Sequence, residues 1–335
     1  MTLFDAGVNL LDRRFDASEV IQRAFEAGVE KLCVITTHPD EWEPAYQLYL
    51  KFPDILCYTI GVHPHHAKDV TAQSLVQLEQ LAQQAGCVAI GECGLDFNRN
   101  FSAQETQLTV FEAQLAIAVK LQKPIYLHER DAFEPQMALL TQYIHHIPNG
   151  IAHCFTGTVE QINAYLSLGL YIGITGWVCD EKRGEALREA IKSMPKDRLI
   201  FETDAPYLFP KTLRPRKRNN EPAFLPHIVK QVSEMLALSE EQLSEYSFAN
   251  SCTLFSIGWE RLMQIHTDKL RNYDVGLLVT AIVAVVLFIS LFLNISPNSS
   301  QAPHYSQLKY RFASSGELNF ENVDNVPDNQ WMPAT

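Results

Sequence analysis

Four residues of types that bind metals or transfer protons stand at corresponding places in four short apolar segments, near the point where each segment ends. They are Glu92, His128, His153 and Asp204. Two imidazoles and two carboxylates can hold a divalent ion such as Mg²⁺, Mn²⁺ or Zn²⁺ and leave positions open for water. A bound ion lowers the pKa of water from about 15.7 towards roughly 7. The set therefore predicts hydrolysis by an activated water, with Asp204 as general base.

Other residues near these segments could bind an anionic substrate. His63 and His65 could donate hydrogen bonds to it from the sequence GVHPHH. Arg130, two residues after His128, could hold a phosphate through two parallel hydrogen bonds. A salt bridge from Arg130 to Asp131 or Glu134 is an equally good interpretation.

The charge distribution restricts where a nucleic acid could bind. The net charge of −12 argues against binding through an overall positive field. The segment 211–218, KTLRPRKR, is the exception, because it carries five cations, including Arg216 and Arg218, and no acid. We expect it to attract a phosphate backbone, although a solvated loop is the simpler alternative.

Elements that could position these residues alternate along residues 1–265. Short apolar runs are separated by amphipathic stretches such as 18–28, 72–86, 109–122, 159–169 and 184–194. The apolar runs are 3–10, 31–36, 55–61, 87–92, 124–129, 150–155, 170–176 and 199–204. Strands that alternate with helices indicate βα units and a parallel sheet.

Eight βα units fit a (β/α)8 TIM barrel, an α/β fold in which the carboxyl ends of the strands form one rim that holds the active site. Residues far apart in the sequence would then converge. A doubly wound open sheet is the alternative, but no G-x-G-x-x-G sequence follows the first run. Each candidate ligand could instead be a structural residue, yet a buried acid without a cation would cost several kcal/mol.

Seven ordered motifs resemble the TatD family of metal-dependent deoxyribonucleases, within the amidohydrolase-like barrels, and are closest to its TatD-proper branch. The motifs are GVHPH (61–65), IGECGLDF (90–97), LHERDA (127–132), HCFTGT (153–158), YIGITGWV (171–178), ETDAPYL (202–208) and NEPAFLPHI (220–228). The resemblance implies a nuclease that prefers single strands, acts as a 3′–5′ exonuclease on DNA, with RNA as an alternative substrate, and uses Mg²⁺.

The resemblance also implies roles for individual residues. Glu92, His128 and His153 would be metal ligands, and Asp204 the catalytic acid next to the metal. Glu202 and His63 belong to the site motifs of the family. The broader family opens with an H-x-H pair, where this sequence has Gly7 and Asn9; this departure predicts one firmly held ion instead of two.

The segment 275–295 contains no charged residue and is long enough to cross a membrane as a helix. We expect a nuclease barrel in 1–265, a juxtamembrane linker in 266–274, a transmembrane helix in 275–295 and a polar, disordered tail in 296–335. Lys and Arg before the span place the barrel in the cytoplasm. Seven cysteines without a C-x-x-C pair indicate reduced thiols there, and we expect a monomer.

Two other functions fit parts of the sequence. The same metal site could hydrolyse an ester or amide, such as an aminoacyl-tRNA linkage, and leave the polynucleotide intact. A non-catalytic membrane scaffold is the other alternative, in which the missing H-x-H pair marks the loss of a metal site. Such a scaffold should retain no stoichiometric metal.

Overall fold

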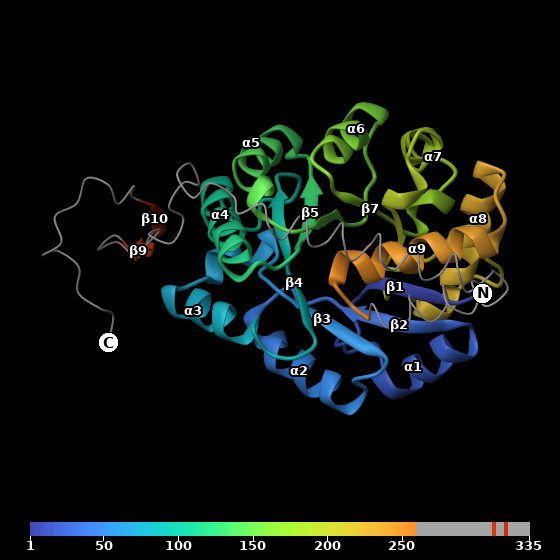
Figure 1. Cartoon of the computed structure of the whole chain (residues 1–335), viewed down its shortest axis with the longest axis horizontal. Helices are drawn as coiled ribbons and strands as arrows, with labels where there is room; N and C mark the ends of the chain where they lie inside the picture. Colours follow the sequence, from blue (N-terminus) through green and yellow to red (C-terminus); the bar gives the residue numbers. More distant parts are fainter. Residues whose placement is uncertain (259–309, 313–317, 321–335) are drawn as a thin grey trace, which may run out of the picture.

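The computed structural model of the chain describes residues 1–258, 310–312 and 318–320. In the first of these ranges, eight parallel strands lie side by side in the order of the sequence (Figure 1). The strands are β1 (Leu3–Val8), β2 (Val29–Val34), β3 (Leu56–Ile60), β4 (Cys87–Asp96), β5 (Ile125–Arg130), β6 (Gly150–Ala152), β7 (Tyr171–Ile174) and β8 (Leu199–Phe201). Each of the eight predicted apolar runs thus overlaps a strand.

The last strand returns to the first. Val8 and Ala205 form an isolated parallel bridge. The Asp204 N–H donates to the Gly7 carbonyl at 2.8 Å, and the Asn9 N–H donates to the Ala205 carbonyl at 2.8 Å. The sheet is therefore a nearly closed barrel, which confirms the predicted eight-stranded parallel architecture, and the open doubly wound alternative is wrong.

Helices surround the barrel because each has one apolar stripe that faces the strands. They are α1 (Ala17–Glu26), α2 (Trp42–Lys51), α3 (Ala72–Leu81), α4 (Gln104–Leu121), α5 (Phe133–Tyr143), α6 (Val159–Ser167), α7 (Glu185–Lys192), α8 (Leu225–Leu236) and α9 (Glu240–Phe255). Side chains of Asp16, Thr71, Thr158 and Ser239 cap the first turns of α1, α3, α6 and α9. These caps satisfy backbone N–H groups that have no partner within a helix.

Short 3-10 helices follow or precede several strands. They are η1 (Pro39–Glu41), η2 (Pro64–Asp69), η3 (Ile144–His146), η4 (Gly176–Cys179), η5 (Lys196–Arg198) and η6 (Pro222–Phe224). The η2 helix begins directly after His63, whose side chain accepts a hydrogen bond from the His65 N–H. This local bond fixes the first turn of the GVHPHH segment at the carboxyl end of β3.

Helix α9 closes the amino end of the barrel, and it crosses in front of the strands in Figure 1. Its Phe255 lies in one apolar cluster with inward-facing residues of the strands. The Phe4 ring is 5.7 Å from the Phe255 ring and 6.1 Å from the Phe248 ring, centroid to centroid. The amino end is therefore filled with apolar side chains, and polar chemistry is left to the carboxyl end.

Strand β4 extends four residues beyond the predicted end at Glu92. Its pairing with β5 is interrupted by a register shift between Ile90 and Cys93. Gly91, at φ 145°, lies so close to β5 that an added Cβ would be 2.3 Å from the Tyr126 carbonyl oxygen. Irregularities of this kind in a strand redirect side chains beside active sites. Here Glu92 lies within the irregular part of β4, between Ile90 and Cys93.

The predicted transmembrane helix 275–295 and linker 266–274 lie outside the described residues. Within the described residues, no helix combines the length and apolar character that a membrane crossing needs. Part of the predicted disordered tail is described as two short antiparallel strands, β9 (Tyr310–Phe312) and β10 (Leu318–Phe320).

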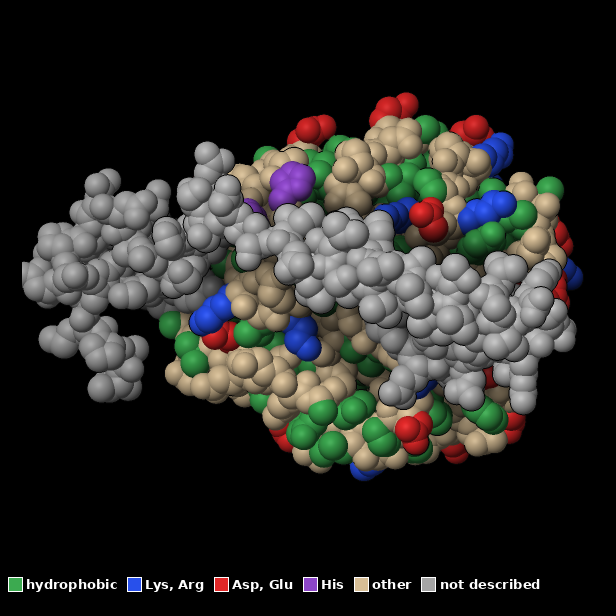
Figure 2. All heavy atoms as spheres, viewed as in Figure 1, with side chains coloured by type: hydrophobic (Ala, Val, Ile, Leu, Met, Phe, Trp, Pro, Cys, Tyr) green, Lys and Arg blue, Asp and Glu red, His purple; other side chains and the backbone are tan. Residues whose placement is uncertain are grey.

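Neither the cysteines nor the visible surface points to a site at the amino end. All seven cysteines are free thiols, as predicted. On the uncovered part of the face in Figure 2, Lys and Arg side chains are interspersed with Asp and Glu. This face therefore presents no concentrated positive patch there.

Candidate active site

A cavity of about 1210 Å³ opens at the carboxyl ends of the strands. All eight strands contribute to its lining through residues within, or just after, their carboxyl-terminal halves, which in the order β1 to β8 are Asn9, Thr37, His63, Glu92, His128, His153, Trp177 and Asp204. The four predicted metal ligands are all among them. Convergence of residues more than a hundred positions apart is what a closed barrel predicts.

Glu92 lies at the centre of this group and is buried. Its Oε1 is 2.9 Å from His128 Nδ1 and 3.6 Å from His63 Nε2. The same oxygen is 3.8 Å from His153 Nε2. Three imidazoles from β5, β6 and the turn after β3 therefore face one carboxylate oxygen.

His153 is oriented from behind by Glu202. Its Nδ1 is 2.7 Å from Glu202 Oε2, while its Nε2 faces Glu92 and lies 3.9 Å from Asp204 Oδ1. The other oxygen of Glu202 accepts the Cys154 N–H. A carboxylate on one ring nitrogen fixes the tautomer that leaves the other free for a metal. Glu202, predicted as catalytic, thus lies behind His153 and is fully buried.

Asp204 is held by Asn9. The Asn9 Nδ2 donates to Asp204 Oδ1 at 2.9 Å and to the Ala205 carbonyl at 3.3 Å. Asp204 adopts φ 51°, a left-handed conformation that is uncommon for residues other than glycine. Asn9 stands where the broader family has the second histidine of its H-x-H pair, so here the position serves Asp204 through an amide.

Without a metal, protons on the histidines balance the negative charges of the carboxylates in the site. Burial opposes ionisation of Glu92, yet the surrounding imidazoles, His63 first, hold its pKa well below its ordinary range. Burial also opposes protonation of His153, but Glu202 and Glu92 outweigh it and raise the pKa of His153 to about 10. Burial raises the pKa of Asp204 to about 7, against the opposing charge of His153.

These pKa shifts describe a cluster in which positive charge on the neighbouring imidazoles stabilises the ionised form of the buried acids. Burial, together with the charge of His128, holds the pKa of His63 well below its usual value. A divalent cation can take over the role of the imidazolium protons, because metal binding displaces protons from its ligands.

The atoms fit a cation in two adjoining groups. Ligand atoms of His63, Glu92 and His128 lie within 4.8 Å of one another, and so do those of His153, Cys154 and Asp204. His128 Nε2 is buried without a hydrogen-bond partner, 3.4 Å from Asp96 Oδ2. A buried nitrogen left without a hydrogen bond is costly, and a metal or an ordered water would satisfy it.

Two predicted substrate contacts line the cavity in different ways. His65 Nε2 is 2.7 Å from Asp96 Oδ2, so this ring is already engaged by a carboxylate. Arg130 is exposed at the end of β5. Among the described residues it forms no ion pair with Asp131 or Glu134, which leaves its guanidinium available at the rim.

The other two predicted substrate contacts do not lie at the cavity. Arg216 and Arg218 are exposed but are not part of its lining. Lys211, in the same basic run, pairs with Asp180 at 2.7 Å, and Lys217 pairs with Glu221 at 3.3 Å. Acids thus neutralise part of the run, and contact of Arg216 and Arg218 with the substrate stays a prediction.

Sequence reasoning missed three residues that hold the site together: Tyr126, Asp96 and Asn9. Tyr126 appears in the sequence as one more apolar position of β5, yet its hydroxyl donates to Glu202 Oε2 at 2.6 Å. Asp96 lay beyond the predicted strand end, although its place in the GLDF motif was a signal that could have identified it. Asn9 was noted only as a missing histidine.

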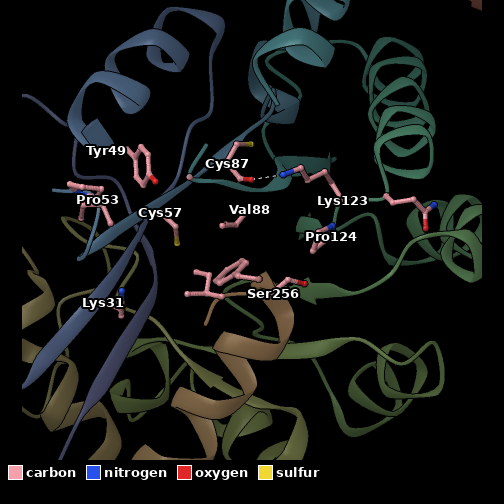
Figure 3. A pocket seen from close by; sticks show the side chains of 14 residues that line it. Lys31, Tyr49, Pro53, Cys57, Cys87, Val88, Lys123, Pro124 and Ser256 are labelled. Atoms are coloured by element: carbon pink, nitrogen blue, oxygen red, sulfur yellow. Dashed lines mark hydrogen bonds between the residues drawn. The ribbon is translucent and has the colours of Figure 1, made fainter. Parts of the chain in front are cut away.

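A second cavity, of about 380 Å³, lies at the amino ends of β2, β3 and β4 (Figure 3). Its cations are already bound to the backbone: Lys31 donates to the Asp54 carbonyl and Lys123 to the Cys87 carbonyl. Burial raises the pKa of Cys87 to about 12, so that its thiol stays protonated. Among the residues that the structure describes, its lining contains no His, Asp or Glu.

Comparison with known proteins agrees with this geometry. Residues 4–256 match the family model of TatD-related DNases. Curated relatives named 3′–5′ ssDNA/RNA exonuclease TatD are 46% identical over 259 residues in Erwinia billingiae and 47% identical over 259 residues in Pantoea ananatis. The alignments cover 76% of this chain, with 99% of the first relative and 100% of the second.

Solved structures give the same result. The TatD homologue YJJV from Escherichia coli K12 superposes with a TM-score of 0.70 at 26% identity, over 76% of this chain and 98% of that one. A TatD-family hydrolase from Entamoeba histolytica gives 0.69 at 26% identity with the same coverage. The family model covers more than half of the sequence and nearly all of the barrel. The chain belongs to the TatD-related DNase family.

Proposed function

We propose that this protein is a metal-dependent nuclease that removes nucleotides from the 3′ end of single-stranded DNA, and of RNA. The observation that carries the proposal is the convergence of Glu92, His128, His153 and Asp204 on one cavity. Curated relatives that align over 99–100% of their own length are named for this activity.

We propose Glu92, His128, His153 and Asp204 as ligands of one divalent ion, Mg²⁺ by preference. When bound, the ion supplies positive charge that lowers the pKa of water and offsets the charge of the phosphate. The carboxylate oxygens suit Mg²⁺, and the two imidazoles also admit Mn²⁺ or Zn²⁺. Chelation followed by addition of each metal, with elemental analysis, distinguishes these ions; a protein that retained none would support the scaffold alternative.

The chain's own residues divide the chemical work. Asp204 accepts the proton of the attacking water, because Asn9 holds only its Oδ1. A carboxylate within reach of the water can act as general base. Glu202 holds the Nδ1 side of His153, and the His63 ring donates a hydrogen bond to the phosphate.

Exposed aromatic side chains at the cavity favour an unpaired strand as substrate. Phe101 is 53% exposed and Tyr207 is 49% exposed, and both line the cavity. The Arg99 guanidinium lies 5.9 Å from the Phe101 ring centroid, and that of Arg14 lies 4.5 Å from the Tyr207 centroid. Bases of a single strand can stack on such rings, whereas paired bases cannot reach them.

The assay uses the purified full-length chain with 5′-labelled single-stranded DNA and Mg²⁺. We expect a ladder of shortened labelled products, and none from the double variant Glu92→Ala with His153→Ala. Absence of cleavage by the wild type, or undiminished cleavage by the variant, would contradict the proposal. A parallel aminoacyl-tRNA substrate tests the deacylase alternative, which predicts release of the amino acid from an intact polynucleotide.

We also propose that residues 275–295 anchor the barrel to a membrane with its active site in the cytoplasm, and that the protein acts as a monomer. The support is the sequence alone: an uncharged segment preceded by Lys and Arg. High-speed centrifugation of lysate should place the full-length chain in the membrane fraction. Recovery in the supernatant would contradict the anchor.

A further inference from the structure

We propose that Tyr126 is a positioning residue for the metal site: its hydroxyl, seated in space that Gly7 leaves open, fixes Glu202 against His153. This inference rests on the proposed metal site. It concerns a residue that lies in the barrel interior, below the cavity, and that is not a ligand itself.

Three polar groups meet at the Tyr126 hydroxyl. The hydroxyl oxygen is 2.7 Å from His153 Nδ1 and 2.6 Å from Glu202 Oε2. His153 Nδ1 is in turn 2.7 Å from the same Glu202 oxygen. Each group is therefore in hydrogen-bond contact with the other two, and Tyr126 and Glu202 are fully buried.

Two protons can satisfy this triangle in one arrangement. The carboxylate of Glu202 only accepts, so the Tyr126 O–H donates to it. Both oxygens then present lone pairs to His153 Nδ1, which must carry the second proton. When metal binding removes the proton of Nε2, its lone pair is left on the opposite side of the ring, facing Glu92 and Asp204. Tyr126 thus favours the ligand-competent tautomer of His153.

The space for this hydroxyl depends on position 7. A Cβ added to Gly7 would lie 2.1 Å from the Tyr126 hydroxyl oxygen and 2.8 Å from Glu202 Oε2. No side chain fits there while Tyr126 keeps its place.

A second glycine seats the other oxygen of Glu202. A Cβ on Gly173 would lie 2.1 Å from Glu202 Oε1. Glu202 is therefore enclosed between Gly7 of β1 and Gly173 of β7, with Tyr126 from β5 above it. Residues of three strands thus fix the position of one carboxylate. A tyrosine that only filled space in the core would not need such contacts.

The test measures Mn²⁺ binding to the metal-free full-length protein by calorimetry, together with its thermal unfolding before metal is added. Tyr126→Phe keeps the ring and removes only the hydroxyl. We expect Mn²⁺ affinity to fall by about 10-fold or more, in the range found for residues that orient metal ligands. The melting temperature of the metal-free protein should stay close to that of the wild type, because the ring and its packing are kept. A general loss of packing would instead lower the melting temperature together with the affinity.

Tyr58→Phe is the matched control, because Tyr58 is also fully buried in a strand and its hydroxyl donates only to the Ala85 carbonyl, at 3.3 Å. It should leave Mn²⁺ affinity unchanged. Wild-type affinity in Tyr126→Phe would overturn the inference while leaving the proposed function intact. Absence of Mn²⁺ binding by the wild type would overturn both.

A double-mutant cycle tests the link to Gly7. Gly7→Ala in the wild-type background should lower Mn²⁺ affinity, since it displaces the hydroxyl. In the Tyr126→Phe background the same substitution should cost less, because the closest clash has been removed. Equal costs in the two backgrounds would overturn the coupling of Gly7 with Tyr126. If Gly7→Ala does not fold, the Tyr126→Phe comparison still decides the positioning role.

Discussion

Replacing Glu202 with glutamine keeps the volume of this side chain and removes its charge. In the wild type its two oxygens accept from Tyr126, from His153 Nδ1 and from the Cys154 N–H. If the amide oxygen stays on the Cys154 N–H, the amide NH₂ faces two donors. His153 can restore one bond only by losing its Nδ1 proton, which leaves a proton on Nε2, the nitrogen that faces the site.

The magnitude follows from this count. A hydrogen bond to a charged group contributes about 1.5–3 kcal/mol. Two are lost, which costs about 3–6 kcal/mol, and one neutral bond of about 0.5–1.5 kcal/mol is restored, so we expect the free energy of unfolding of the metal-free protein to fall by about 1.5–5.5 kcal/mol. Metal binding must then reverse the tautomer of His153, which predicts a further loss of Mn²⁺ affinity of about 10–100-fold.

Urea unfolding followed by circular dichroism measures the first quantity, and calorimetric Mn²⁺ titration measures the second. Glu129→Gln is the control, since Glu129 also lines the cavity but accepts only the Ala132 N–H, at 2.8 Å. A Glu202→Gln protein with wild-type Mn²⁺ affinity would refute the orientation of His153 by Glu202, whatever its activity.

Three further predictions concern other parts of the barrel. Glu92→Gln should lower the cleavage rate by more than about 100-fold, beyond the cost of an indirect ligand contact; retained cleavage would exclude Glu92 as a ligand. Burial raises the pKa of Asp5 from 3.8 to about 7, so the folded state binds this proton more tightly than the unfolded chain. Its contribution to stability therefore decreases as pH rises from about 4 to about 7, by at most about 4 kcal/mol. Asp5→Asn should flatten that dependence in urea unfolding at pH 4.5 and 7.5, and an unchanged slope would contradict the assignment. Phe101→Ala and Tyr207→Ala should each raise KM for single-stranded DNA about 10-fold through lost stacking, with little change in kcat; unchanged KM would remove these rings from the substrate path.

The fold was predictable because each strand is a short apolar run and each run is followed by an amphipathic helix. Sequential βα units leave few topologies open. The exception is β4, whose end was placed at Glu92 although it continues to Asp96. A register shift within the strand has no signature in apolar periodicity alone.

The candidate site was predictable for the same reason, since residues that end parallel strands meet at one rim. His153 and Asp204 needed only that rule. Tyr126 could not be identified, because a tyrosine inside an apolar run looks like a core residue until its hydroxyl is seen against Glu202. The pairing of Lys211 with Asp180 could not be predicted either, because it joins residues of different loops.

The most direct test of the central claim is an anomalous diffraction map from crystals of this protein soaked with Mn²⁺. The account predicts a peak enclosed by the side chains of Glu92, His128, His153 and Asp204, at bonding distance from their oxygen and nitrogen atoms. A map with no peak there, or with its peak at other side chains, would contradict it.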